Sequence, residues 1–203
     1  MHEEIWRSLP PGAVAPDLER RARFALSLVR PGERVLDVGC GDGAIAARLA
    51  AAGALVTGAD VAGEALRRAG GRGAAVELVR LEEGEPWPFA DGAFDVVWAS
   101  EVIEHVADTA AWLSELRRAL APGGRIGLTT PDTGPLTLAA MALSPGFAAR
   151  RLDPVGDHLH FYNARSLRAL LADFGFERVD VRRAGGVPGA RTTLLASAVR
   201  RRF

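Results

Sequence analysis

The sequence lacks lysine, so its 25 basic residues other than histidine are all arginines. Without lysine, the chain cannot form the Schiff base that holds pyridoxal phosphate or supply the Walker lysine that reaches a nucleotide phosphate. It also has only one cysteine, Cys40, so an intrachain disulfide and a cysteine-based zinc cluster are both impossible. These absences exclude several classes of enzyme and metal-binding protein.

The chain also lacks an excess of either charge, because 25 acidic residues balance the basic ones. A net charge of zero gives no long-range field to attract nucleic acid or an anionic membrane, so neither partner is expected. The apolar run from Leu136 to Leu143 is too short to cross a bilayer, and the acidic segment 1–4 does not resemble a signal peptide. We therefore expect a cytoplasmic monomer or homodimer.

Strand-like and helix-like apolar patterns alternate along the chain. Seven strands are predicted, at residues 34–38, 54–59, 75–80, 94–99, 124–130, 176–183 and 192–200. Helices are predicted at residues 17–29, 44–52, 63–69, 109–120 and 163–174. Such alternation favours an α/β fold, in which right-handed crossovers place helices on both faces of a sheet. The pattern predicts one doubly wound, Rossmann-like domain over residues 1–203, with a mostly parallel seven-stranded sheet and an antiparallel C-terminal strand.

Two segments flank or interrupt this alternation. Residues 1–30 are expected to form an N-terminal helix or lid, with Ile5 and Trp6 placed before the helix. Residues 131–162 contain several prolines and glycines and lose the regular pattern. A long irregular connection in a compact domain is often functional, so we expect 131–162 to be a lid over the substrate.

The most informative motif joins the first predicted strand to the next helix. Apolar residues around Asp37 suit a buried strand, and Gly39, Gly41 and Gly43 follow where the backbone must turn. Glycine permits positive φ and lets a ligand approach the bare backbone. Asp60 ends the second strand, where a carboxylate can accept hydrogen bonds from ribose hydroxyls. The motif therefore predicts a nucleotide-cofactor pocket.

Two cofactors fit these glycines, because the spacing also satisfies a loose dinucleotide fingerprint with Ala44 in its last position. Asp37 distinguishes them. A carboxylate so close to the glycines would repel the pyrophosphate of NAD, but it would attract an ammonium group. S-adenosylmethionine carries an ammonium and has no phosphate, so Asp37 favours that cofactor.

Ordered motifs beyond the glycines resemble class I S-adenosylmethionine-dependent methyltransferases over residues 34–181. The segment 87–97 resembles the family's loop and fourth strand, and Pro122-Gly123-Gly124 resembles its turn before the fifth strand. Ser100 to Val106 is similar to the subgroup of ubiquinone-pathway O-methyltransferases. The resemblance implies a methyltransferase with S-adenosyl-L-methionine as cofactor.

Several residues are assigned to the cofactor by this resemblance. Asp37 would hold the methionine ammonium, Gly39 and Gly41 would contact the cofactor through their backbone, and Asp60 would bind the ribose. The adenine site departs from the family pattern, because Arg80 stands where an acid is common. Either the Glu82 carboxylate or the backbone and apolar side chain of Leu81 could replace that acid. The neighbouring positions Cys40, Val61, Ser100 and Glu101 complete the predicted cofactor-binding set.

Three histidines are candidates for catalysis. His105 follows the fourth predicted strand, on the rim where the methyl group should project, and an unperturbed imidazole titrates near neutral pH. His158 and His160 lie in the lid segment. These imidazoles could remove a proton from a hydroxyl acceptor or line its pocket.

A metal site is the alternative for the same region. Glu101, Glu104 and His105 occupy one turn of chain, and His158 could supply a further ligand from the lid. This combination resembles the metal site of small-RNA 2′-O-methyltransferases. A bound cation would hold vicinal hydroxyls and lower their pKa.

The sequence thus predicts transfer of a methyl group to a small-molecule acceptor, at oxygen in preference to other atoms. Two different classes remain as rivals: an NAD-dependent oxidoreductase and a cofactor-binding protein without catalysis. The identity of the acceptor is not readable from the residues.

Overall fold

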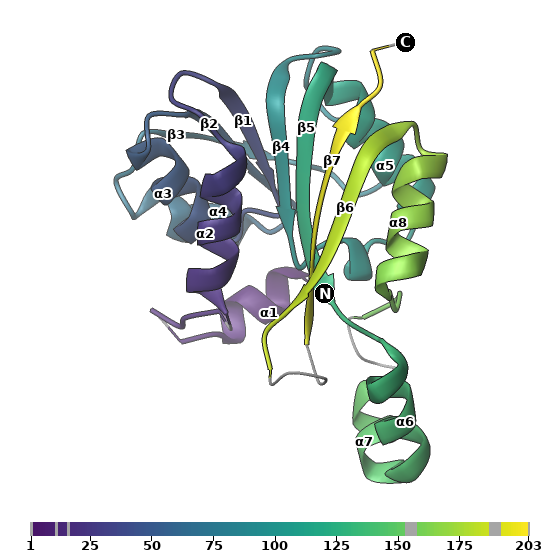
Figure 1. Cartoon of the computed structure of the whole chain (residues 1–203). Coiled ribbons are helices and arrows are strands. Elements are labelled where there is room, and N and C mark those ends of the chain that lie inside the picture. Colours follow the sequence, from purple (N-terminus) through teal and green to yellow (C-terminus); the bar gives the residue numbers. More distant parts are fainter. Residues whose placement is uncertain (1, 11, 16, 153–157, 187–191, 203) are drawn as a thin grey trace.

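The computed structural model describes residues 2–10, 12–15, 17–152, 158–186 and 192–202. Its strands are β1 (Arg34–Val38), β2 (Leu55–Asp60), β3 (Val76–Arg80), β4 (Phe94–Ser100), β5 (Leu120–Pro131), β6 (Phe176–Ala184) and β7 (Thr193–Arg200). They form one sheet in the order β3-β2-β1-β4-β5-β7-β6 (Figure 1). Only β7 runs against its neighbours β5 and β6. The predicted α/β fold with an antiparallel C-terminal strand is confirmed.

The start of β5 differs from its predicted position at residue 124. Phe94 of β4 pairs with Leu120, but the next pair joins Val96 to Arg125, so the register shifts between the two strands. The predicted turn at Pro122-Gly123-Gly124 therefore lies inside the span of β5 as a bulge.

The helices are α1 (His2–Ser8), α2 (Leu18–Leu28), α3 (Ala44–Ala51), α4 (Gly63–Gly70), α5 (Thr109–Ala119), α6 (Pro135–Leu143), α7 (Pro145–Arg151) and α8 (Ala164–Asp173), with a 3₁₀ turn η1 (Ile103–His105). Ile5 and Trp6, expected to precede the first helix, lie inside α1. Two further helices, α6 and α7, occupy the segment expected to be irregular. None of the described side chains of α1 or α6 is buried, so neither helix has the buried stripe that a helical period reveals.

Alternate residues of the central strands pack on opposite faces of the sheet. Val35 and Trp98 belong to the cluster beneath α2 and α3, whereas Leu36 and Val97 belong to the larger cluster beneath α5 and α8. Figure 1 shows α2, α3 and α4 on one side of the sheet and α5 and α8 on the other. Because both faces are covered, the strands are largely apolar along their length.

The strand order reverses between β1 and β4, which are parallel neighbours although β2 and β3 separate them in sequence. Ligands of open α/β sheets bind at such a switch point, beyond the carboxyl ends of the strands. In Figure 1, α1 crosses this end of the molecule, and α6 and α7 project from it. Among the described residues, no helix is long and apolar enough to cross a membrane.

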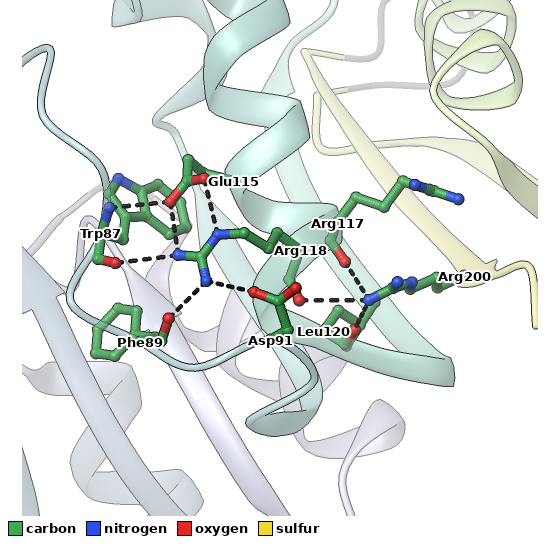
Figure 2. A network of polar contacts seen from close by, with 8 residues as sticks. All are labelled: Trp87, Phe89, Asp91, Glu115, Arg117, Arg118, Leu120 and Arg200. Carbon is green, nitrogen blue, oxygen red and sulfur yellow. Dashed lines mark hydrogen bonds and ion pairs between the residues drawn. The ribbon is translucent and has the colours of Figure 1, made fainter.

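Arg118 of α5 forms hydrogen bonds with the loop between β3 and β4 (Figure 2). Its guanidinium makes two bonds to the Glu115 carboxylate, at 2.9 and 2.8 Å, and donates to Asp91 at 2.9 Å. It also donates to the carbonyl oxygens of Phe89 and Trp87, at 2.6 and 3.0 Å. This network holds residues 87–91, the segment that leads into β4.

Candidate functional site

The glycine loop after β1 is closely packed, as Gly39 and Gly41 show. Gly39 and Gly41 have φ of +67° and +56°. A Cβ on Gly39 would lie 2.4 Å from Cγ2 of Val102, and one on Gly41 would lie 2.6 Å from Cζ2 of Trp6. Any side chain at these positions would therefore displace residues at the rim as well as strain the backbone.

Asp60 connects the glycine loop to the end of β2. Its Oδ2 atom accepts a hydrogen bond from the Gly41 amide at 2.9 Å, and Oδ1 accepts one from the Ala62 amide at 2.9 Å. Burial raises the pKa of Asp60, and these amides oppose the shift. Each carboxylate oxygen can accept a second hydrogen bond.

Asp37 is the most deeply buried acid of the cofactor site, with 2% of its surface exposed. Its Oδ2 atom is buried and has no hydrogen-bond partner among the described residues. Burial, followed by the charge of Asp60, raises the pKa of Asp37 to about 8. A buried carboxylate oxygen without a donor is costly, and an ammonium group placed here would satisfy it. The site therefore fits the amino group of S-adenosylmethionine.

Arg21 of α2 brings a buried cation to the same site, with only 6% of its surface exposed. Its Nη1 atom donates to Oγ of Ser100 at 3.0 Å. Burial raises the pKa of Asp37 and of Glu101, and the positive charge of Arg21 opposes both shifts. The guanidinium thus lies within electrostatic reach of both acids.

Glu101 has a backbone conformation that is rare for residues other than glycine, with φ of +56°. Its Oε1 atom accepts a hydrogen bond from Oγ1 of Thr129 at 2.7 Å, and its amide donates to the Thr129 carbonyl at 2.9 Å. Such strain persists where the surrounding contacts hold it, and it is frequent at functional sites. These contacts fix Glu101 next to Ser100 at the end of β4.

Sequence reasoning did not single out Arg21 as a site residue, and it did not place Trp6 at the glycine loop. A signal for Arg21 was present, because it falls on the apolar stripe of its helix beside the buried Ala22 and Ala25. No comparable pattern marked Trp6, since its contact with Gly41 depends on how α1 folds back over the sheet.

The adenine candidates occupy different environments. The Leu81 side chain is buried, and its amide donates to the Asp60 carbonyl at 2.9 Å. Glu82, in contrast, has an exposed side chain that lies 3.6 Å from Nε of Arg80. Val61 is partly buried and packs against the larger core cluster.

Cys40 contributes backbone to the glycine loop, while its side chain packs inward. A Cβ on Gly58 would lie 3.1 Å from its Sγ atom, so the thiol points toward β2. Burial raises the pKa of the Cys40 thiol, followed by the charge of Asp37. A protonated, buried thiol is a poor nucleophile, so the Cys40 side chain contributes to packing.

Glu104, His105 and His158 form a compact cluster next to the cofactor residues. One ligand atom of each lies within 4.8 Å of those of the other two. The rings of His105 and His158 meet edge to face at 4.7 Å, and Nε2 of His105 is 3.9 Å from Oε1 of Glu104. Glu101, the fourth residue of the predicted metal set, does not belong to this cluster.

The lid segment is joined to η1 through the carbonyl oxygen of Glu104. The amides of Leu159 and His160 donate to this oxygen at 2.7 and 3.0 Å. The Nε2 atom of His160 is buried and has no hydrogen-bond partner among the described residues. The fold thus brings His105, His158 and His160 to one end of the sheet from segments about 50 residues apart.

Comparison with known proteins identifies the family. A methyltransferase domain family matches residues 12–181. The chain is 32% identical over 177 residues to a ubiquinone biosynthesis O-methyltransferase of Psychrobacter arcticus, covering 84% of this chain and 67% of that protein. It is 36% identical over 186 residues to a nocamycin O-methyltransferase of Saccharothrix syringae, covering 87% of this chain and 63% of that enzyme. The chain therefore spans about two thirds of the length of these relatives.

Solved structures share the fold at lower identity. A methyltransferase of Methanosarcina mazei superposes with a TM-score of 0.70 at 20% identity, over 93% of this chain and 98% of the other. Phosphoethanolamine N-methyltransferase 2 of Haemonchus contortus, solved with S-adenosyl-L-methionine, gives 0.69 at 19% identity, over 90% of this chain and 52% of the other. The family match decides between the two cofactors that the glycines allowed. The chain belongs to the class I S-adenosylmethionine-dependent methyltransferases and resembles the ubiquinone-pathway O-methyltransferases among them.

Proposed function

We propose that this methyltransferase acts on a hydroxyl oxygen of a small molecule, with His105 as the base. The observation that carries the proposal is the cluster of Glu104, His105 and His158 beside the cofactor residues. Relatives at 32% and 36% identity that are named O-methyltransferases support oxygen as the acceptor atom.

Each of the cofactor residues is proposed to bind a different part of the methyl donor. Asp37 would pair with its ammonium, and Arg21 would pair with its carboxylate, because Arg21 is a buried cation whose charge already acts on Asp37. Asp60 would accept from the ribose hydroxyls. The loop residues Gly39, Cys40 and Gly41 would offer their backbone, while Val61, Leu81, Glu82, Ser100 and Glu101 would line the remaining surface.

The bound S-adenosylmethionine supplies a methyl group on a sulfonium, whose positive charge disappears on transfer. The acceptor oxygen bonds to the methyl carbon as the carbon–sulfur bond breaks, and the hydroxyl proton must pass to a base. His105 is placed for this role, because the Glu104 carboxylate at 3.9 Å would stabilise the imidazolium that results. His158 and His160 would line the acceptor pocket and orient the hydroxyl.

Replacing the imidazole tests this role. In His105→Gln, methyl transfer to the best acceptor from a panel of phenols and catechols should fall by about 10²–10⁴-fold. The affinity for S-adenosylhomocysteine should stay within twofold, because His105 is not proposed to touch the donor. Arg67→Gln, on the exposed side of α4, is the control variant and should keep full activity. Full activity in His105→Gln would refute the role of His105 as the base.

A divalent cation is a second candidate, favoured by the same cluster. Two imidazoles and one carboxylate within 4.8 Å of one another form a donor set that suits zinc and related metals. Glu104, His105 and His158 would hold the ion, which would orient vicinal hydroxyls and lower their pKa. If this candidate is correct, exhaustive chelation should abolish activity and added metal should restore it. Full activity after chelation would leave His105 as the base.

A further inference from the structure

Helix α1 lies directly over the proposed cofactor site. The benzo edge of Trp6 occupies the space that the missing side chain of Gly41 leaves open, with Cζ2 and Cη2 at 2.6 and 3.0 Å from a Cβ built there. The glycine loop is the part of the fold where a cofactor approaches the backbone most closely. Trp6 therefore borders the same space as the cofactor.

The first turn of α1 reaches two other parts of the site. The ring of His2 lies 6.0 Å from that of His105, the proposed base. Oε2 of Glu3 accepts a hydrogen bond at 3.2 Å from the Glu64 amide, in the first turn of α4. Helix α1 thus extends from the glycine loop to η1 and α4.

The contacts that hold α1 are few and mostly polar. None of its described residues is buried. Arg68 of α4 lies over the Trp6 ring, 5.8 Å from the ring centroid, and donates to the Leu9 carbonyl at 2.9 Å. Val14, in the connection to α2, is 76% exposed. Such an element can open at low cost in free energy, and additional contacts with a ligand would favour its closed position.

We infer that α1 closes the cofactor site and that Trp6 is a positioning residue, whose indole holds the methionine part of the donor against the glycine loop. This inference rests on the cofactor placement proposed above. Arg68 supports the indole from the side of α4. Release of the cofactor then requires α1 to lift, so the indole should slow dissociation more than it affects association.

Binding of S-adenosylhomocysteine to the full chain tests the inference. In Trp6→Ala, the Kd measured by calorimetry should rise about tenfold, a change of about 1.4 kcal/mol, with most of the change in the dissociation rate measured by stopped flow. Trp6→Phe should restore part of the affinity, because it returns an aromatic ring. Arg68→Ala should shift both quantities in the same direction by less. Glu4→Ala, on an exposed position of the same helix, should leave them unchanged.

Two results would overturn the inference. A Kd for Trp6→Ala within twofold of the unaltered chain would show that the indole does not hold the donor. A large fall in the melting temperature of ligand-free Trp6→Ala would show that the indole supports the fold instead. Asp60→Ala separates this failure from that of the cofactor placement. If Asp60→Ala weakens binding and Trp6→Ala does not, only the role of α1 fails; if neither weakens it, the cofactor lies elsewhere.

Discussion

At the scale of single residues, the proposed cofactor site buries two neighbouring acids, Asp37 and Asp60. Asp37 and Asp60 are 2% and 7% exposed, and the charge of Asp60 adds to the burial that raises the pKa of Asp37. Burying a carboxylate oxygen without a donor, such as Oδ2 of Asp37, opposes folding. This free-energy cost is typical of a ligand-binding site, because binding sites commonly trade stability for function.

The pKa of Asp37, raised to about 8 from an ordinary value of 3.8, predicts a proton exchange on binding. Near pH 7 this carboxyl is mostly protonated in the free chain, and a ligand ammonium favours its charged form. Binding of S-adenosylmethionine should therefore release protons, and the release should shrink as the pH rises above the pKa of Asp37. Calorimetry in buffers of different ionisation enthalpy measures it. A binding enthalpy that does not depend on the buffer would contradict the prediction.

The same shift has a consequence for stability. A carboxyl whose folded pKa is raised contributes most below its unfolded pKa, and the contribution is lost as the pH rises toward about 8. Asp37→Asn should therefore raise the melting temperature of the ligand-free chain, and by more at pH 8 than at pH 5. It should also weaken cofactor binding. An equal effect on melting at both pH values would argue against the buried charge.

At the scale of elements, hydrogen bonds attach the loops around the proposed site to the sheet and helices. Arg118 holds the 87–91 loop by its side chain, and the Glu104 carbonyl holds the lid segment by two backbone amides. Loops position functional groups well only when the scaffold fixes them. Helices α6 and α7 project beyond these contacts, and α6 has three exposed leucines, Leu136, Leu138 and Leu143.

Removing the Arg118 network should destabilise the fold. Arg118→Met keeps the length of the side chain but loses its bonds to Glu115, Asp91 and two backbone carbonyls, which should lower the free energy of unfolding by about 2 kcal/mol. Urea denaturation measures the change. Arg67→Met, which breaks an exposed pair with Glu64 on the surface of α4, should have no measurable effect. Similar midpoints for the two variants would show that the network is dispensable.

At the scale of the whole molecule, the proposed site is built from segments that lie far apart in the chain. Trp6 and Arg21 come from the first helices, Asp37 and Asp60 from the ends of β1 and β2, and His158 from beyond α7. Because a ligand that touches all these segments binds only the native chain, it should stabilise the whole domain.

A thermal-shift comparison measures this linkage. S-adenosylhomocysteine at about 100 times its Kd should contribute about 2.7 kcal/mol, which raises the melting temperature by roughly 5–10 °C for a domain of this size. NAD at the same concentration should give no shift, because Asp37 would face its phosphates. Stabilisation by NAD alone would contradict the cofactor assignment.

The sequence by itself determined the alternation of strands and helices, the glycine loop and the two buried acids. Each depends on local requirements: apolar runs for buried strands, positive φ at Gly39 and Gly41, and a carboxylate at the end of a strand. Local requirements leave periodic or positional patterns, and these can be read without coordinates. The family motifs, which are also local in sequence, indicated S-adenosylmethionine as the methyl donor.

Only the tertiary structure decided which distant residues meet. It placed Trp6 on the glycine loop, separated Glu101 from the cluster of Glu104 and His158, and buried Arg21 at the cofactor site. The helices α1 and α6 escaped prediction because they bury no described side chain and so show no amphipathic period. Contacts of this kind depend on packing between elements, and one-dimensional periodicity carries no information about them.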